Sequence, residues 1–484
     1  MNQSNCNKLA GILFIVGIII LILIQPNNTW PHYTDDCLDY DKIEKGEEVH
    51  YTACDWDAIY VYGPIIAGKK SVTDWHSSLY MYECKALQTI AATFSLPADG
   101  IRAQIVLYYI YFIITLSFAC HFIYQLIKNN IINALLFIPV CISVVIALRW
   151  MPLVLDYFFC CHFIVLCILL WYLLRANKRA YKIIGWILVG VCILHMANFR
   201  KNAICIIPFI CYIFFRCNGI FAKKITNRII SSLLLAAAIT GICIVLPSLV
   251  APVKHTYPLS PMLSSDVRIA AVLRGEQEAF REEMRAMGRK EKDLKHPLMN
   301  SLSASPRAEL ALPKCYPYYF REWKKNFDSM LMSKAIQIAE FYSGGCMPHP
   351  VFCKIVEYFY PKIKSNHDAW KYWRQVSNDI KYYHIIILVI GFGFTFYFAY
   401  VRYKNIRPLT NLEKTAALTC SMAVLYALSF SIVTPTAFLR YLAPSFFIIW
   451  NAIWFWLADV LFRQARLNCV KNETIRTVNT KLWH

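Results

Sequence analysis

The sequence predicts an all-α polytopic membrane protein with about ten transmembrane helices, and its composition is the first reason. Of the 484 residues, 58% are hydrophobic and only 17% are charged, whereas soluble domains carry about 25% charged residues because their surface faces water. Aromatic residues make up 15% of the chain, which is typical of proteins with Trp and Tyr at both membrane interfaces. Much of the surface is therefore expected to face lipid.

The second reason is the number of long apolar runs. A helix needs about 20 apolar residues to cross the hydrocarbon core. The predicted spans lie near residues 9–25, 103–126, 131–148, 152–174, 183–197, 203–215, 229–250, 383–401, 415–433 and 441–462. The fifth and sixth runs are short and form either one hairpin or two tilted spans. Because no small-residue cleavage pattern follows Ile24, the first run is expected to stay as an anchor.

The charges between these runs predict the orientation. Short cytoplasmic loops collect Lys and Arg, and every second connection here is basic. These basic residues are Lys8, Lys128, Arg175, Lys178, Arg179, Lys182, Arg216, Lys223, Lys224, Arg228, Arg402, Lys404, Arg407, Arg463 and Arg466. We therefore expect a multi-pass protein of the cytoplasmic (inner) membrane with both termini in the cytoplasm.

This threading divides the chain into three parts. Residues 1–250 hold seven spans and an acidic outer loop at 26–102, residues 251–382 form a mostly helical extracytoplasmic segment, and residues 383–484 hold the last three spans and a cytoplasmic tail. In the middle part we expect a helix from Ser265 or Asp266 to about Lys292 and a second one near 318–342.

Cysteines outside the membrane provide a separate prediction. Six fall in the two outer segments, and an even number in an oxidising compartment favours at least one disulfide among them. They are Cys37, Cys54, Cys84, Cys315, Cys346 and Cys353. No CxxC pair occurs, so the sequence gives no support for a zinc site.

The net charge of +20 is explained by basic loops and by attraction to anionic lipid. Membrane lipids are therefore expected partners, and no nucleic-acid partner is expected. Four cationic residues depart from the orientation rule because they lie in short outer connections: Arg149, Arg200, Lys201 and Arg440. Either they reach lipid phosphates at the interface, or they converge on an anionic ligand, for which the planar guanidinium is well suited.

The acidic outer loop holds the complementary groups. Asp55 and Asp57 flank Trp56 and precede two tyrosines, and His76 follows Asp74 and Trp75. Aromatic rings can stack on the apolar faces of a sugar while a carboxylate accepts a proton from a hydroxyl. Solvated loop carboxylates are the alternative interpretation.

Three short strings resemble those of the GT-C superfamily of bacterial membrane glycosyltransferases. DWHSSLY at residues 74–80 is similar to a DWHxPLY-like string, with Ser in place of Pro, and NFRKNA at 198–203 is similar to an RxNA element. Arg440-Tyr441 with Pro444 resembles a late RYxxP element. The order of an anchor, an acidic outer loop, further spans and a late soluble portion is also GT-C-like, although residues 251–382 match no part of that family.

This resemblance implies a sugar donor carried on a polyprenyl phosphate and a glycan, lipid or protein acceptor at the outer membrane face. Asp55 or Asp57 would be the catalytic base, and Arg200 and Arg440 would bind the lipid phosphate. The other residues implied in substrate or phosphate binding are Arg149, Lys201, Tyr441 and His76. No organic cofactor is implied, and metal dependence varies within the superfamily, so a divalent metal is neither indicated nor excluded.

Two other classes of function compete with this interpretation. A lipid-linked glycan polymerase or an O-antigen ligase shares the span number, the large late loop and the outer arginines, but the long loop after the first span favours the transferase. A transporter or flippase would carry charge in mid-span and internal repeats, neither of which is apparent here. A non-catalytic envelope assembly protein would need none of these side chains.

Overall fold

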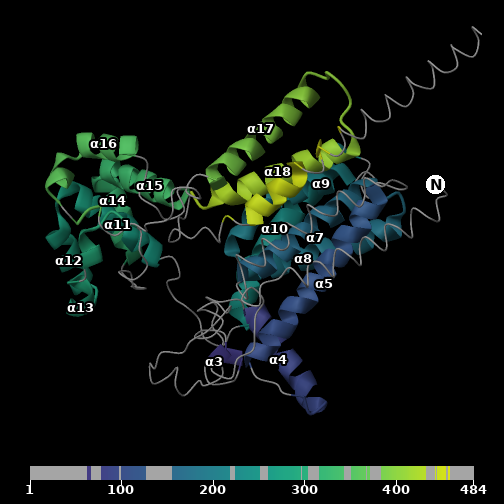
Figure 1. The fold of residues 1–484 in the computed structure, drawn as a ribbon, viewed down its shortest axis with the longest axis horizontal. Coiled ribbons are helices and arrows are strands. Elements are labelled where there is room, and N and C mark those ends of the chain that lie inside the picture. The colour runs from purple at the N-terminus through teal and green to yellow at the C-terminus, as the bar shows by residue number, and fades with distance from the viewer. Residues whose placement is uncertain are drawn as a thin grey trace, which may run out of the picture.

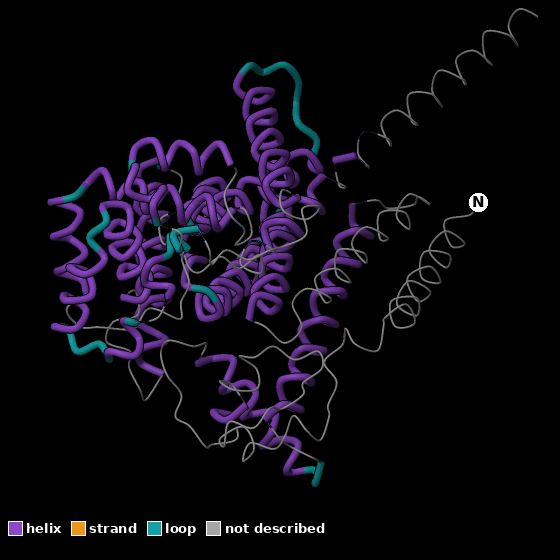
Figure 2. The backbone as a smooth tube through the Cα atoms, turned by 60° about the vertical axis from the view of Figure 1, so that its left-hand side comes forward, coloured by secondary structure: helices purple, strands orange, loops and turns teal. Residues whose placement is uncertain are grey.

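The computed structural model describes part of the chain in detail. The described residues are 63–66, 78–96, 100–126, 155–217, 224–250, 260–295, 297–303, 315–342, 350–366, 368–370, 383–431, 442, 444–453, 456–457 and 460. Within them all regular structure is helical and no strand occurs (Figures 1 and 2). The all-α prediction is confirmed to that extent.

The described helices fall into two sets. The first set comprises α3 (Gly63–Ile66), α4 (Ser78–Thr93), α5 (Gly100–Leu126), α7 (Leu155–Arg175), α8 (Arg179–Phe199), η3 (Lys201–Ile206), α9 (Ile207–Cys217), α10 (Ile225–Val250), α17 (Tyr383–Tyr403) and α18 (Asn411–Ser429). The second set comprises α11 (Ser260–Arg274), α12 (Gln277–Ala286), α13 (Glu291–Leu294), η5 (Pro297–Asn300), α14 (Cys315–Lys325), α15 (Phe327–Tyr342), α16 (Pro350–Phe359) and η7 (Pro361–Ser365). We call them the bundle and the small helical body.

Four helices of the bundle are long and apolar enough to cross a membrane: Tyr157–Arg175, Arg179–Phe199, Ile225–Cys243 and Ile386–Tyr403. Shorter apolar helices cover Ala103–Ala119, Ala203–Arg216 and Pro444–Ile453. On α10, large apolar side chains such as Leu233 and Leu234 are exposed, as expected of a surface whose solvent is lipid. These helices support the membrane class, whereas the count of ten spans stays a prediction.

The outcome differs from one predicted span to the next. The runs at 9–25 and 131–148 lie outside the described residues. The fifth and sixth runs form separate helices, α8 and the η3–α9 segment, because the chain is extended at Arg200 between them. The ninth run lies in α18, which is a largely buried helix.

The bundle has two distinguishable ends. α7 and α18 run antiparallel, since Phe159 near the start of α7 stacks on Tyr426 near the end of α18 at 4.6 Å between ring centroids. α8 returns antiparallel to α7, since His162 stacks on His195 at 4.9 Å. The start of α7, the end of α8 and the end of α18 therefore share one end, which we call the Arg200 end.

The opposite end carries the basic connections. Arg175 lies at the end of α7, Arg216 at the end of α9 and Arg402 at the end of α17. These connections were predicted to lie on one side, and the helix directions agree with this. We call this side the basic end; its assignment to the cytoplasm is still a prediction.

A capping box fixes the start of α18 at the basic end. The Thr410 hydroxyl accepts from the Glu413 backbone N–H at 3.1 Å, and the Glu413 carboxylate accepts from the Thr410 N–H at 2.9 Å. This reciprocal pair satisfies two backbone donors that a helix start leaves open. Arg407 adds an ion pair to Glu413 at 2.6 Å, so one predicted basic-loop residue orders the turn between α17 and α18.

The small helical body corrects one sequence prediction. The single helix expected from Ser265 or Asp266 to about Lys292 begins earlier, at Ser260, and is broken twice. Gly275 at φ +72° and Gly288 at φ +95° end α11 and α12, because only glycine adopts such angles without steric cost. The helix predicted near 318–342 is confirmed, as α14 and α15 with a break at Asn326.

Two buried charges hold this body together. The fully buried Arg268 donates from its guanidinium to the carbonyls of Ser301 and Ser303. Asp266, also buried, pairs with Lys334 at 2.6 Å. Burial raises the pKa of Asp266, against the opposing effect of Lys334. These contacts tie α11 to α15 and to the segment after η5.

The small helical body contacts the bundle at the Arg200 end (Figure 1). The Tyr342 hydroxyl, at the end of α15, donates to the Ala427 carbonyl at 2.8 Å. The Phe341 ring lies 5.1 Å from that of Phe430, just after α18. The end of α15 is thereby fixed to the end of α18.

The structure limits which of the six outer cysteines could form the predicted disulfide. All three described members of the predicted set, Cys84, Cys315 and Cys353, are buried, and no disulfide joins any two of them. Cys84 lies in the hydrophobic core of the bundle, and Cys315 lies in a separate hydrophobic cluster of the small helical body. Any disulfide would have to involve Cys37, Cys54 or Cys346, which lie outside the described residues.

Candidate functional site

Most of the predicted site residues lie outside the part of the chain that the structure describes. These are Asp55, Asp57, His76, Arg149, Arg440 and Tyr441. Arg200 and Lys201 are within it, at the junction of α8 and η3. The site is therefore built from Arg200 and from the described neighbours of the predicted strings.

Arg200 terminates α8. Its backbone is extended, with φ −144° and ψ 112°, and its N–H donates to the Met196 carbonyl at 2.8 Å. A cation at a helix C-terminus interacts favourably with the partial negative charge of the last carbonyls. The chain then turns directly into η3 and α9, so Arg200 is partly buried at the rim of the bundle.

Two of the three family-like strings meet at this rim. The backbone N–H of Leu79, in the first turn of α4, donates to the Asn198 side-chain oxygen at 3.1 Å. Next to it, Tyr80 is fully buried, with its ring 4.9 Å from Phe158 and 6.3 Å from Phe199. The end of the 74–80 string is thus held against the start of the 198–203 string.

Directly after the third string, Ser445 packs against α18. Leu442 is fully buried, and the Ser445 hydroxyl donates to the Ala423 carbonyl on α18 at 2.8 Å. η3, which follows Arg200, also packs against α18. α18 is therefore a common neighbour of η3, which holds the end of the 198–203 string, and of Ser445, which directly follows the 440–444 string.

A polar cluster lies one helical turn below the contact between Leu79 and Asn198. The Tyr111 hydroxyl, on α5, is 3.1 Å from both carboxylate oxygens of Glu83 on α4 and 3.2 Å from Nδ1 of His195 on α8. Glu83 Oε1 is itself 3.4 Å from His195 Nδ1. His162, on α7, stacks on the His195 ring, with its own Nδ1 2.7 Å from the Phe158 carbonyl. Four helices thus contribute one side chain each.

The carboxylate of this cluster is suited to proton exchange. Burial raises the pKa of Glu83 from 4.5 to about 7, against the opposing effect of the Tyr111 hydrogen bond. Its side chain keeps 22% of its surface accessible. A group that is half protonated near neutral pH and still reachable can both accept and donate a proton.

The sequence analysis missed this cluster, although a signal was present. His162 and His195 lie inside predicted spans, and an ionisable residue at such a position is a functional-site candidate by default. Histidine with its usual pKa is largely neutral at pH 7, so neither residue registers as mid-span charge in the sequence. Glu83 could not be distinguished from the other carboxylates of the acidic loop, since only the tertiary contact with α5 and α8 buries it.

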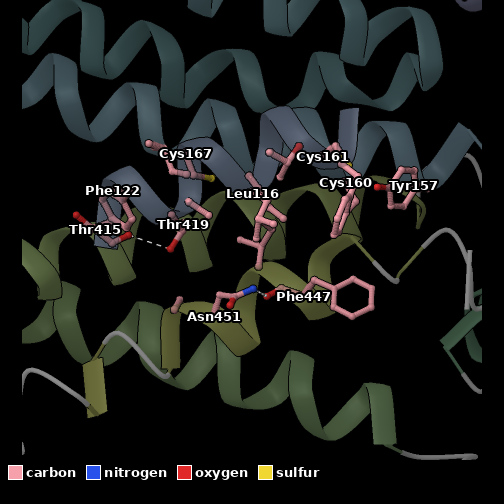
Figure 3. Close-up of a pocket in the computed structure, with 17 residues that line it drawn as sticks. Leu116, Phe122, Tyr157, Cys160, Cys161, Cys167, Thr415, Thr419, Phe447 and Asn451 are labelled. Atoms are coloured by element: carbon pink, nitrogen blue, oxygen red, sulfur yellow. Dashed lines mark hydrogen bonds between the residues drawn. The ribbon is translucent and has the colours of Figure 1, made fainter. Parts of the chain in front are cut away.

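A separate cavity of about 70 Å³ lies between α5, α7, α18 and the helix at 444–453 (Figure 3). Its lining is almost wholly apolar. The Thr419 hydroxyl donates to the Thr415 carbonyl at 2.9 Å, and the Asn451 amide donates to the Phe447 carbonyl at 2.7 Å. These two donors bond within their own helices, so they do not point a hydrogen bond into the cavity.

Among the described residues, no group of three His, Cys, Asp or Glu side chains has an arrangement that could hold a metal ion.

No protein-family model matches the chain, and no curated protein sequence matches it.

Proposed function

We propose that the chain is a GT-C-type glycosyltransferase that uses a polyprenyl-phosphate-linked sugar at the Arg200 end, which would face the outside of the cytoplasmic membrane. The observation that carries the proposal is the hydrogen bond between Leu79 and Asn198. It joins two strings that are more than a hundred residues apart in sequence and that both resemble elements of that superfamily. Such pairing is expected if the two strings build one site.

The proposed reaction is a single displacement. The acceptor oxygen forms a bond to the anomeric carbon, the bond from that carbon to the phosphate oxygen breaks, and polyprenyl phosphate leaves. The acceptor proton passes to Asp55 or Asp57. Arg200 and Arg440 would stabilise the negative charge that develops on the leaving phosphate, with Arg149, Lys201, Tyr441 and His76 as further binding residues.

The depth of the polar cluster supports an enzyme working at the membrane surface. His195 lies four residues before the end of α8, which places it about 6 Å below that end at 1.5 Å per residue. Transporter sites typically lie near the midplane, about 15 Å from either face of the hydrocarbon core. The cluster is accordingly closer to the rim than to the midplane.

A proton-coupled transporter is the second candidate, because a buried His162 beside the half-buried Glu83, Tyr111 and His195 can also relay protons. Proton flux into proteoliposomes distinguishes the two functions. A transporter requires substrate-dependent flux that Glu83→Gln abolishes, and the transferase requires none.

Variants of the proposed site should distinguish its two roles, which are proton acceptance and phosphate binding. In lipid nanodiscs supplied with a polyprenyl-phosphate sugar, Asp55→Asn or Asp57→Asn should lower turnover about a hundredfold or more for whichever is the base, with donor binding unchanged. Arg200→Ala should weaken donor binding as well as turnover, because a phosphate loses a charge-assisted partner.

Arg216→Ala is the matched control, since it removes the same side chain at the basic end of the bundle and should leave both quantities unchanged. Parental turnover in both aspartate variants would rule out the proposed base. Equal effects of Arg200→Ala and Arg216→Ala would rule out a phosphate site at the Arg200 end.

A further inference from the structure

One face of α16 is apolar and exposed. The side chains of Val351, Ile355, Tyr358 and Phe359 retain 59%, 44%, 77% and 63% of their surface. Their spacing of four, three and one residues places them on one side of a helix. The opposite side holds the buried Cys353 and packs into the small helical body. We call the four exposed residues the α16 stripe.

The α16 stripe is unusual for a surface in water. Single exposed apolar residues are common, but a contiguous apolar patch marks an interaction site. The remaining exposed side chain on this face is Lys354, and Lys364 is exposed just beyond the helix. An apolar helix face bordered by lysines is the pattern of a helix lying in a membrane interface.

The attachment of the small helical body keeps this helix close to the bilayer. Tyr342 is bonded to α18 at the Arg200 end, and α16 begins only after residues 343–349. On its other side, α17 begins at Tyr383 and returns the chain to the bundle. Figure 1 shows α12 and α13 at the opposite end of the body from α16. The segment 350–365 is thus connected to membrane helices on both sides.

We propose that the α16 stripe inserts into the interfacial layer of the bilayer leaflet at the Arg200 end, with Lys354 and Lys364 paired to anionic lipid phosphates. The stripe would lie at the depth of the headgroups and first methylenes, parallel to the surface. The inserted stripe would then be a second attachment point, besides Tyr342, and would orient the small helical body over the Arg200 end. The inference concerns membrane attachment and holds whether or not the bundle transfers sugars.

Site-specific photocrosslinking tests the contact on the full chain. p-Benzoylphenylalanine replaces Tyr358 in one variant and Glu282, an exposed residue of α12, in the control variant. Each is irradiated in nanodiscs of phosphatidylethanolamine and phosphatidylglycerol, and adducts are identified by mass spectrometry. We expect lipid adducts at position 358 at ten times or more the yield at position 282.

The adducts themselves distinguish the occupants. Crosslinks from position 358 to another segment of this chain or to a second copy would overturn the proposal, as would equal lipid yields at the two positions. Replacing phosphatidylglycerol with phosphatidylcholine should lower the yield at 358 several-fold, and so should Lys354→Glu combined with Lys364→Glu. If neither the lipid replacement nor the double lysine variant changes the yield at position 358, the pairing of the lysines with anionic lipid is overturned.

Discussion

Glu83 shows how a single residue acquires chemistry from its surroundings. In the unfolded chain it is one carboxylate among many in an acidic stretch. In the fold it is half-buried beside α5 and α8, with Tyr111 and His195 as neighbours. A buried carboxylate is harder to ionise because its charge loses hydration, which explains the direction of its pKa shift.

This shift predicts a pH-dependent stability. Because the folded pKa of Glu83, about 7, exceeds its usual value of 4.5, the neutral form is favoured in the fold. The contribution of the neutral carboxyl group to the free energy of unfolding is fully present below pH 4.5 and is lost as the pH rises through 7. The difference corresponds to about 3 kcal/mol at most. Glu83→Gln should therefore raise the unfolding midpoint relative to the parent at pH 8 but not at pH 4.5, measured by thermal unfolding in nanodiscs.

Tyr111→Phe is the useful companion variant. The Tyr111 hydrogen bond lowers the pKa of Glu83, so removing the hydroxyl should shift the loss of stability of the parent to higher pH. If Glu83→Gln alters stability equally at pH 4.5 and pH 8, the carboxylate does not titrate as described.

At the scale of the elements, close helix packing depends on glycine at particular positions. A Cβ at Gly391 on α17 would lie 2.7 Å from Ile449 Cδ1 and 3.2 Å from Val424 Cγ2. Both neighbours are β-branched and restricted in their rotamers. Small residues at such positions let helices approach closely in a membrane, where van der Waals packing drives their association.

Gly391→Ala should therefore destabilise the bundle, by about 1–3 kcal/mol, which is typical of overpacking. Gly393→Ala, two residues along the same helix, is the matched control because its Cβ would meet nothing within 4 Å. Thermal unfolding of both variants in the same nanodiscs checks the difference. A Gly393→Ala variant that is destabilised as much as Gly391→Ala would contradict the packing of α17 against α18.

Helix ends in the small helical body show where sequence patterns stop being informative. The apolar and charged spacing from Ser265 to Lys292 fits one long helix, and only the positive φ angles of Gly275 and Gly288 reveal the two breaks. Glycine is tolerated inside helices at a cost of about 1 kcal/mol, so its presence alone does not predict a break.

At the scale of the whole molecule, composition and hydropathy predicted the membrane class and the helical architecture, because both follow from how much apolar surface the chain must hide. The alternation of basic connections also predicted which ends of α7, α9 and α17 lie together. Tertiary contacts were not predictable in this way. The pairing of Glu83 with Tyr111 and His195 requires α4 to pack beside α5 and α8, and no local pattern encodes that approach.

The site was predicted only in part for the same reason. Arg200 was identified from its charge at an unfavourable position, and the structure places it at the rim where two strings meet. The two histidines were overlooked because their neighbours along the chain are uniformly apolar. A cluster contributed by four helices is recognisable only once the helices are packed.

The most direct test of the central claim, a polyprenyl-phosphate site at the Arg200 end, is the identity of the lipid that the purified protein retains. Lipid extracted from the parent and from Arg200→Ala should be compared by mass spectrometry. The account predicts polyprenyl phosphate or its sugar-linked form with the parent, at several-fold lower occupancy in Arg200→Ala. Recovery of bilayer phospholipids alone from the parent, in a preparation from cells that contain the polyprenyl carrier, would contradict it.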